Sequence, residues 1–527
     1  MRPADQPPLN IAATAGLWLT VIVLSLWRLV VAWGVPVTQD EAYYFDWART
    51  LDWGYFDHPP AVALLGVGNA LVPTSVLAAR SGTVLAASMT LLVLIRLYRC
   101  SGLRGGTLLL ALLVAGYSLP GLVSGVIATP DTVLGLCWAL ALHEALPALR
   151  GQRWRWLGVG AAAGLGLLGK YTMAMIGPVF LWAILWADPK ALRSPWPYLG
   201  ALVAVAVFLP NLFWNAQNDW LTLRFQFAHG FSTDAGALLT TNLPVPVGAA
   251  GALPDGDAIA LSLVDRLAAV IAFLGTQAVL WGFFLVPLAA STWHRAESLR
   301  SRVSQRLDRP ARALLIAASA FPLIFFAWVA SFSSVEPNWP APYLLGAAPL
   351  AALAAKPRFG WMLAAAGANL LVTTLYAAHA ATGQPPLPAG AQRILRETHG
   401  YAELARRVRE LDRPVFADRY QIVAMLRFYA PTLAVTQWPG ITRPSEYLRG
   451  TIAAPVSLEQ VREAEGFWLI TSHSVPPEIP GFVRRSGRIL VDCAGAPLAE
   501  RAMDERTEPC ARPLHRWGLF DYEVATP

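Results

Sequence analysis

Long apolar runs recur along the first 380 residues of this chain, and they restrict it to one class of fold. A helix that crosses a bilayer needs roughly 20 apolar residues. Eleven stretches are candidates, at 11–33, 76–96, 106–124, 131–148, 156–170, 172–187, 196–213, 264–290, 313–333, 341–355 and 359–380. Only 14% of the 527 residues are charged, against roughly 25% in soluble proteins. The sequence therefore predicts a polytopic α-helical membrane protein with about 11 spans and excludes a water-soluble one.

Basic residues fall in alternate loops between these runs. They gather at 96–104, 150–155, 190–193, 294–312 and 356–358, and the other loops are acidic, aromatic or neutral. Cytoplasmic loops carry the excess of Lys and Arg, so the N-terminus is predicted in the cytoplasm and the C-terminus outside. The net charge of +7 reflects these loops and does not indicate nucleic acid. The first run is too long for a cleaved signal and lacks a small-residue cleavage site, so we expect a retained helix.

Residues 156–187 test the number of crossings. Basic loops flank this stretch on both sides, so both ends are expected in the cytoplasm. Two short helices that meet near residues 169–171 satisfy this condition, and a re-entrant pair is the alternative. Either arrangement places Lys170 at the outer side.

The composition changes after about residue 385. A helical pattern at 401–411 alternates with short strand-like runs at 415–417, 467–471, 489–491 and 519–524. We predict a transmembrane domain over residues 1–384 and a small exported α/β domain over 385–527. Cys493 and Cys510 lie in the second domain, where an oxidising exterior would suit a disulfide; two free thiols are the alternative.

Acidic and aromatic residues crowd the first outer loop, residues 34–60. Thr38 and Glu41 have the spacing of a capping box, so Glu41 can serve as a helix cap. Asp40 is not needed for that cap; it either offsets the helix dipole or has a function. The helix that follows carries one apolar stripe and is expected to lie flat in the membrane interface, with Asp46 and Asp52 on its wet side.

Two further acidic positions open the next segments on the outer side. Asp57 and His58 are held by two prolines that follow them, and such a pair can bind a cation, hold an anionic headgroup or exchange protons. A polar turn is the alternative. Asp131 follows Thr129-Pro130, an ordinary helix start, where it either offsets the dipole or borders an anion site.

Cations and a stiff turn complete the set of candidates. Lys170 interrupts an apolar run, where a charge is costly and usually functional; phosphate binding is the obvious use, and a snorkelling lysine is the alternative. Arg80 is a weaker candidate of the same type. Glu336, Asn338 and Trp339 form a proline-stiffened outer turn that is either a site or only a turn. Amides and aromatics also alternate over 211–229, as in sugar sites or interface belts.

These motifs resemble the superfamily of protein O-mannosyltransferases and lipid A aminoarabinose transferases, which are GT-C glycosyltransferases. The motifs are Asp40-Glu41, the run 56–60, the helix start 129–132, the segment 169–171 and the turn 336–340. The last three are similar to the bacterial branch, glycosyltransferase family 39 with RgtA/B/C/D-like members. The likeness covers about residues 10–380.

The resemblance implies an enzyme of the bacterial inner membrane that takes a sugar from a polyprenyl phosphate at the outer face. It implies that Asp40 occupies the position of the catalytic carboxylate and that Asp57, His58 and Asp131 match further site positions. Some relatives carry lysine where His58 stands, which shifts phosphate binding towards Lys170. Some relatives are linked to a divalent metal, but no residue here demands a cofactor.

The chemistry of the residues agrees with this implication. An acceptor hydroxyl needs a general base, for which Asp40 and its neighbour Glu41 are the candidates, and no nucleophile is evident, so an inverting direct displacement is expected. Lys170, His58 and Arg80 are predicted to bind the donor phosphate. The sugar or acceptor site is predicted to use Asp57, Asp131, Glu336, Asn338 and Trp339.

The sequence leaves the sugar and the acceptor open. Lipid, glycan and protein acceptors all fit. The rival classes are a lipid or glycan transporter, which predicts charges at the midplane and an inverted repeat, and a receptor that binds through the exported domain. We find neither midplane charges nor a repeat.

Overall fold

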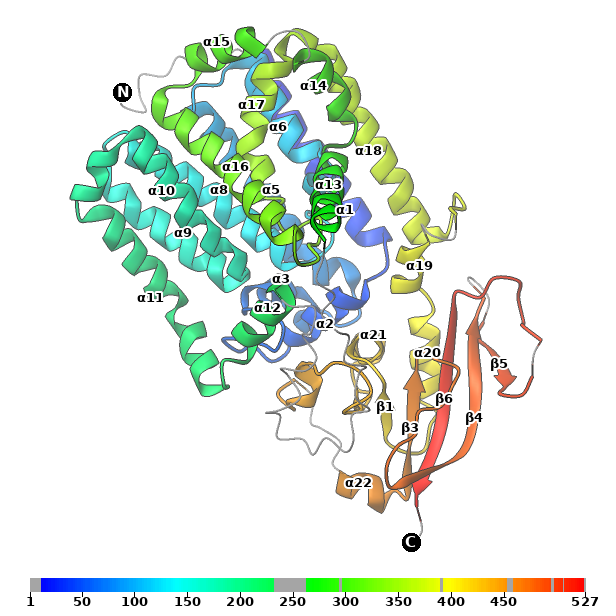
Figure 1. Ribbon diagram of the computed structural model, residues 1–527. Helices are drawn as coiled ribbons and strands as arrows, with labels where there is room; N and C mark the ends of the chain where they lie inside the picture. The colour runs from blue at the N-terminus through cyan, green and yellow to red at the C-terminus, as the bar shows by residue number, and fades with distance from the viewer. Residues whose placement is uncertain are drawn as a thin grey trace.

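A helical bundle and a smaller sheet domain make up this chain (Figure 1). The computed structural model describes residues 11–231, 262–292, 296–388, 392–452, 458–493, 497–505 and 507–525. The bundle takes up the chain to Thr382, where α18 ends, and the sheet domain follows from α19 onward. The predicted fold class, a helical membrane domain with a small α/β domain after it, is confirmed.

Every predicted apolar run is helical. The helices are α1 Ile11–Gly34, α5 Val76–Cys100, α6 Gly105–Tyr117, α8 Pro130–Leu149, α9 Trp156–Gly169, α10 Ile176–Ala187, α11 Trp196–Gln217, α13 Leu263–Trp281 with α14 Leu285–Thr292, α16 Arg309–Ala330, α17 Tyr343–Ala355 and α18 Phe359–Thr382. Among the described residues, seven helical segments are long and apolar enough to span a membrane by length and composition. Others, such as α6, are shorter, so the number of eleven crossings stays a prediction.

Shorter elements connect or flank these helices. They are α2 Gln39–Trp47, α3 Ala61–Leu65, α4 Val67–Leu71, α7 Leu119–Val123, α12 Leu221–Phe231 and α15 Ala296–Arg306. Small residues allow close packing inside the bundle. A Cβ atom on Gly160 of α9 would come within 1.9 Å of the Gly200 carbonyl oxygen of α11, so these two backbones touch only because both residues are glycine.

The predicted break at Lys170 is present. Helix α9 ends at Gly169, Lys170 is extended, and a 3-10 turn at Tyr171–Met175 leads into α10. Two short helices therefore meet at this point, as expected from the basic loops at both ends. The break places Lys170 between two apolar helices, α9 and α10.

The second domain is built on a six-stranded sheet of order β2-β1-β3-β6-β4-β5. Its strands are β1 Val415–Ala417, β2 Val435–Gln437, β3 Gly466–Thr471, β4 Phe482–Asp492, β5 Ala499–Ala502 and β6 His515–Val524, and its helices are α19 Arg393–Thr398, α20 Tyr401–Val408, α21 Tyr420–Tyr429 and α22 Leu458–Glu463. Strands β1, β2 and β3 run parallel, and the other pairs are antiparallel. The predicted disulfide between Cys493 and Cys510 is present.

Helix α2 does not lie with a wet side in the interface, which corrects the prediction. It packs against α21 of the second domain, and Figure 1 shows the two helices side by side. Asp46 is buried and accepts hydrogen bonds from Arg49, Arg427 and Tyr447, whereas Asp52 is exposed and accepts one from the Trp214 indole. Arg427 and Tyr447 lie 381 and 401 positions from Asp46 in the sequence. The local sequence around Asp46 therefore could not reveal its burial.

A buried ion pair ties the start of α2 to the bundle. The Arg80 guanidinium donates to both carboxylate oxygens of Glu41, at 2.8 and 2.6 Å, and neither side chain is exposed. Glu41 also accepts from the backbone N–H groups of Thr38 and Ala128. Arg80 donates in addition to three carbonyls at the end of α1, including that of Val35.

This arrangement corrects two predicted roles. The capping box of Thr38 and Glu41 is present, and the carboxylate of Glu41 is fully engaged, so it does not fit a catalytic role. The guanidinium of Arg80 is committed to Glu41 and to the carbonyls of α1, so it does not fit phosphate binding. Both residues serve the structure, because a charge buried near hydrocarbon requires a partner.

We predict that Glu41→Ala lowers the free energy of unfolding by about 3–5 kcal/mol, because it leaves Arg80 buried without its counter-ion. The measurement is an SDS titration of the purified protein in mixed micelles, followed by tryptophan fluorescence. Glu403→Ala, which removes a surface partner of Arg406, is the control and should leave the transition unchanged. Equal transitions for both variants would contradict a structural role of the pair.

Candidate active site

A cavity of about 790 Å³ lies where the ends of the helices meet the second domain. Its lining contains eight of the ten residues predicted for catalysis, phosphate binding or sugar and acceptor recognition: Asp40, Asp57, His58, Asp131, Lys170, Glu336, Asn338 and Trp339. Glu41 and Arg80 are not among its lining residues. Segments far apart in the sequence therefore converge on one cavity.

Among the acidic residues of α2, Asp40 is the one whose side chain lines this cavity. Its side chain is exposed to the cavity, and the surrounding protein keeps most bulk water away. This desolvation raises the pKa of Asp40 above its ordinary value, and the carboxylates of Glu397 and Asp57 add to the rise. A hydrogen bond of 3.1 Å from the Tyr420 hydroxyl acts in the opposite direction. The result is a carboxylate that accepts a proton more readily than one in water.

Asp57 and His58 form the second element of the cavity. Arg443 of the sheet domain pairs with Asp57, with 2.7 Å between Nη1 and Oδ1. Gln226 of α12 donates to the Asp57 carbonyl and lies 3.3 Å from Nδ1 of His58. Asp57 is buried, and the positive charge of Arg443 compensates its negative charge. His58 is partly exposed and lines the cavity.

A third element joins α8 to the break after α9. The Lys170 ammonium donates to one oxygen of Asp131 at 2.7 Å, and the Asn338 amide donates to the other oxygen at 2.7 Å. Lys170 is almost fully buried. An ammonium group has three N–H donors, so Lys170 can hold Asp131 and still offer hydrogen bonds to an anion in the cavity.

The turn at 336–340 closes this side of the cavity. Glu336 is exposed, and its carbonyl accepts a bond from the Trp339 N–H. The Trp339 ring packs at 6.0 Å from Phe326 of α16. The predicted site residues of this turn therefore lie at the cavity, next to Asp131.

The sequence predictions missed the contribution of the second domain. Tyr420 starts α21 and Arg443 follows β2, and both line the cavity. The Arg443 guanidinium lies over the Tyr420 ring, 4.4 Å from its centre, and over the Phe225 ring. No local pattern marks either residue. Gln226, also missed, belongs to the run of amides and aromatics noted at 211–229.

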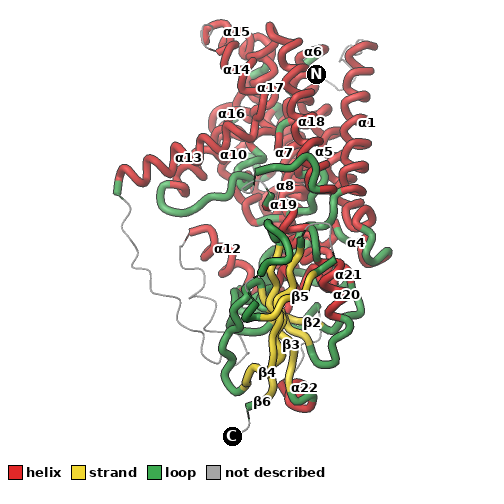
Figure 2. The backbone as a smooth tube through the Cα atoms, turned by 90° about the vertical axis from the view of Figure 1, so that its right-hand side faces the viewer, coloured by secondary structure: helices red, strands yellow, loops and turns green. Residues whose placement is uncertain are grey.

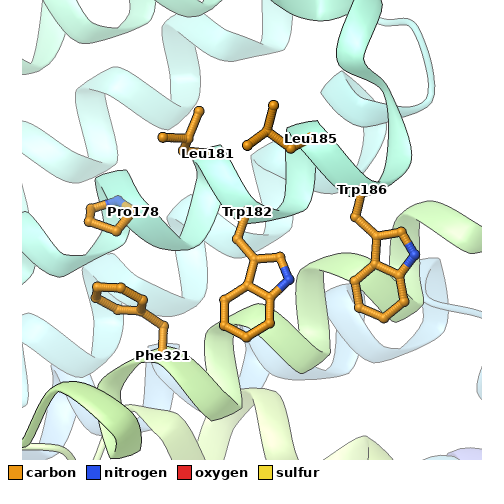
Figure 3. A pocket seen from close by; sticks show the side chains of 6 residues that line it. All are labelled: Pro178, Leu181, Trp182, Leu185, Trp186 and Phe321. Carbon is orange, nitrogen blue, oxygen red and sulfur yellow. The ribbon is translucent and has the colours of Figure 1, made fainter.

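Two more cavities lie in the bundle. One of about 480 Å³ shares Thr129, Asp131 and Asn338 with the first cavity. The other, of about 600 Å³, lies between α10 and α16 and is lined by Pro178, Leu181, Trp182, Leu185, Trp186 and Phe321. Figure 3 shows these apolar side chains around an open hollow. With no charged residue in its lining, the hollow suits hydrocarbon and not chemistry.

The described residues do not form a cluster of three or more His, Cys, Asp or Glu side chains of the kind that holds a metal ion. Asp57, the carboxylate next to His58, is already paired with Arg443. The residues present therefore do not fit a resident metal, and we derive no step through one.

The family model described as "Dolichyl-phosphate-mannose-protein mannosyltransferase" matches residues 57–214. The chain is 29% identical to lipid A galacturonosyltransferase RgtD of Rhizobium johnstonii over 222 residues, which cover 39% of this chain and 44% of that protein. The alignment thus spans less than half of the length of this curated relative.

Solved structures match nearly the whole chain. The crystal structure of ArnT from Cupriavidus metallidurans bound to undecaprenyl phosphate has a TM-score of 0.60 at 16% identity, and the match covers 96% of this chain and 98% of that one. The apo structure of the same protein gives a TM-score of 0.59 with 97% and 98% coverage. This chain has the GT-C glycosyltransferase fold. The resemblance inferred from the motifs is confirmed, and the likeness to ArnT extends over both the bundle and the sheet domain.

We predict that Arg443→Met loosens the contact between the two domains of this GT-C fold, because it leaves Asp57 buried without its partner. Amide hydrogen exchange should become faster in α2 and in α21. Arg485→Met, on an exposed strand position of the same domain, is the matched control and should exchange like the unchanged protein. Unaltered exchange in α2 of the Arg443 variant would show that the pair does not hold the domains together.

Proposed function

We propose that this protein is a membrane glycosyltransferase that moves a sugar from a polyprenyl-phosphate donor to a hydroxyl of a lipid, glycan or protein acceptor at the outer face of the bacterial inner membrane. One observation carries the proposal: a single cavity at the helix ends holds a desolvated carboxylate, Asp40, together with the cations Lys170 and Arg443 and with His58. Transfer from a lipid phosphate needs a base for the acceptor and positive charge for the leaving group.

Asp40 acts as the general base. A hydroxyl is a weak nucleophile, and a carboxylate with a raised pKa removes its proton as the new bond forms. The acceptor oxygen attacks the anomeric carbon, and the bond from that carbon to the phosphate oxygen breaks with its electrons on the phosphate. A single displacement inverts the anomeric configuration. Tyr420 holds the base in place through its hydrogen bond to Asp40.

Lys170 and His58 bind the donor phosphate, and the developing negative charge is stabilised there. Only one hydrogen bond of Lys170 goes to Asp131, so its remaining N–H groups can donate to the phosphate. The N-terminal turn of α8, at Pro130 and Asp131, also lines the cavity, and the N-terminus of a long helix favours an anion. Arg443 adds a further positive charge to the wall.

The sugar and the acceptor are held by the remaining lining residues. Asp131, Glu336 and Asn338 offer polar groups for hydroxyls, and Trp339 provides an aromatic ring at the same wall. Asp57 contributes to this site by holding Arg443 in place. The similarity to a lipid A galacturonosyltransferase and to a protein solved with undecaprenyl phosphate favours an undecaprenyl-type donor and a glycolipid acceptor. The direct test is release of undecaprenyl phosphate from radiolabelled undecaprenyl-phosphate sugars by the purified protein; a transporter or a receptor would release none.

We predict that Asp40→Asn reduces the transfer rate by about 100-fold or more, because the loss of a general base typically has an effect of this size. The amide is isosteric, so the unfolding transition should stay unchanged. Asp219→Asn, on an exposed residue with a positive φ angle that asparagine tolerates, is the control and should transfer sugar normally. Near-normal transfer by the Asp40 variant would refute the assignment of the base.

We predict that Tyr420→Phe moves the acid limb of the pH–rate profile to higher pH. The hydroxyl of Tyr420 lowers the pKa of Asp40, so its removal lets the pKa of Asp40 rise further. A base works only when deprotonated, so activity is then lost at a higher pH as the solution becomes more acidic. Tyr198→Phe, on an exposed tyrosine far along the chain, should keep the original profile. A shift towards lower pH would contradict the contact.

A further inference from the structure

The cavity of about 480 Å³ runs into the bundle beside the candidate active site, and we call it the side slot. Its walls come from α1, α5, α6, α7, α8, α13 and α17 and from the turn before α17. Figure 2 shows α5, α7 and α8 within the bundle, above the sheet domain. The walls are mostly apolar, with leucines such as Leu91, Leu94 and Leu344. Thr129, Asp131 and Asn338 line both this slot and the larger cavity.

Arg28 of α1 is the cation of the side slot. It is 2% exposed. One of its nitrogens, Nη2, donates to the Gly121 carbonyl at 2.8 Å, whereas Nε and Nη1 have no hydrogen-bond partner within the described part of the chain. No carboxylate of the described residues forms a salt bridge with it. The guanidinium lies against Gly125, where a Cβ atom would come within 2.1 Å of Nε.

A guanidinium without a counter-ion at this depth is costly, and the N–H groups of Nε and Nη1, which are buried without a partner among the described residues, can donate to an anion. Asp131, the carboxylate that borders the slot, is paired with Lys170 and Asn338 and forms no salt bridge with Arg28. The slot therefore combines one unmatched positive charge with long apolar walls. This combination is complementary to a lipid with an anionic headgroup.

We propose that the side slot binds the phosphate of an acidic acceptor lipid at Arg28, with the hydrocarbon chains of that lipid against the leucines. The assignment to the acceptor rests on the proposed function, in which Lys170 and His58 hold the donor phosphate in the larger cavity. The shared border at Thr129, Asp131 and Asn338 is where the acceptor hydroxyl reaches the donor sugar. Arg28 is thus a binding residue for the second substrate and not part of the chemistry.

The test measures binding of radiolabelled dioleoyl phosphatidic acid to the purified full-length protein in detergent micelles. Dioleoylglycerol has the same chains without the phosphate, and inorganic phosphate lacks the chains; neither should compete at equal concentration. Arg28→Gln should weaken binding about 10-fold or more, because charge-assisted hydrogen bonds are lost, and Arg28→Lys should restore most of it. Arg96→Gln, on an exposed arginine of α5, is the matched control and should bind like the unchanged protein.

A second variant fills the slot and leaves Arg28 in place. Gly135 of α8 lines the slot, and a Cβ atom there meets nothing within 4 Å, so a larger side chain has room to enter. Gly135→Phe should abolish binding of phosphatidic acid, and Gly135→Ala should preserve it. If Arg28→Gln does not fold, the test rests on Gly135→Phe. Unchanged binding of phosphatidic acid by that variant overturns the proposal.

The donor is measured in the same preparations, so that the two proposals fail separately. Undecaprenyl phosphate should bind the unchanged protein and Arg28→Gln equally, and Lys170→Gln should weaken it. No binding of undecaprenyl phosphate by the unchanged protein would refute the proposed donor, whatever phosphatidic acid does. Three outcomes would overturn the acceptor site: phosphatidic acid does not bind the unchanged protein, it binds Arg28→Gln normally, or dioleoylglycerol displaces it equally well. If Arg28→Gln loses the binding of undecaprenyl phosphate and of phosphatidic acid equally, the slot belongs to the donor and the proposed acceptor site is overturned.

Discussion

The buried ion pair between Glu41 and Arg80 is the interaction on which the site geometry depends. It joins the end of α1, the start of α2, the start of α5 and the segment that leads into α8. Consecutive residues on a helix point about 100° apart, so fixing Glu41 towards the bundle turns its neighbour Asp40 towards the cavity. Two adjacent carboxylates thus have separate surroundings: Glu41 holds helices together, and Asp40 lines the cavity.

Hydrocarbon around the bundle places the polar groups at the end of the bundle that faces the sheet domain. Backbone groups inside a membrane must be satisfied within the protein, so the spanning segments are helices, and the breaks between them provide the polar side chains. Lys170 enters at such a break, Asp131 at a helix start and Glu336 in a turn. The sheet domain then covers these ends, which converts an open polar surface into a cavity with little bulk water.

The apolar runs predicted the helices well because burial in lipid depends on composition over about 20 residues, which a sequence displays directly. The motifs around Asp57, Asp131 and Lys170 were likewise readable, since rigid prolines and isolated charges stand out locally. The burial of Asp46 and the positions of Tyr420 and Arg443 were not readable. Each depends on a contact between residues that lie hundreds of positions apart, and nothing in their own neighbourhoods distinguishes them from surface residues.

The hydrogen bond between Tyr420 and Asp40 joins residues 380 positions apart, and this distance gives the protein an order of assembly. A chain is made from its N-terminus, so Asp40 reaches its place beside the membrane long before the sheet domain exists. Until that domain docks on α2, water surrounds the carboxylate, and the desolvation that raises its pKa is absent. A prematurely ended chain would therefore carry Asp40 without the surroundings that raise the pKa of its carboxylate.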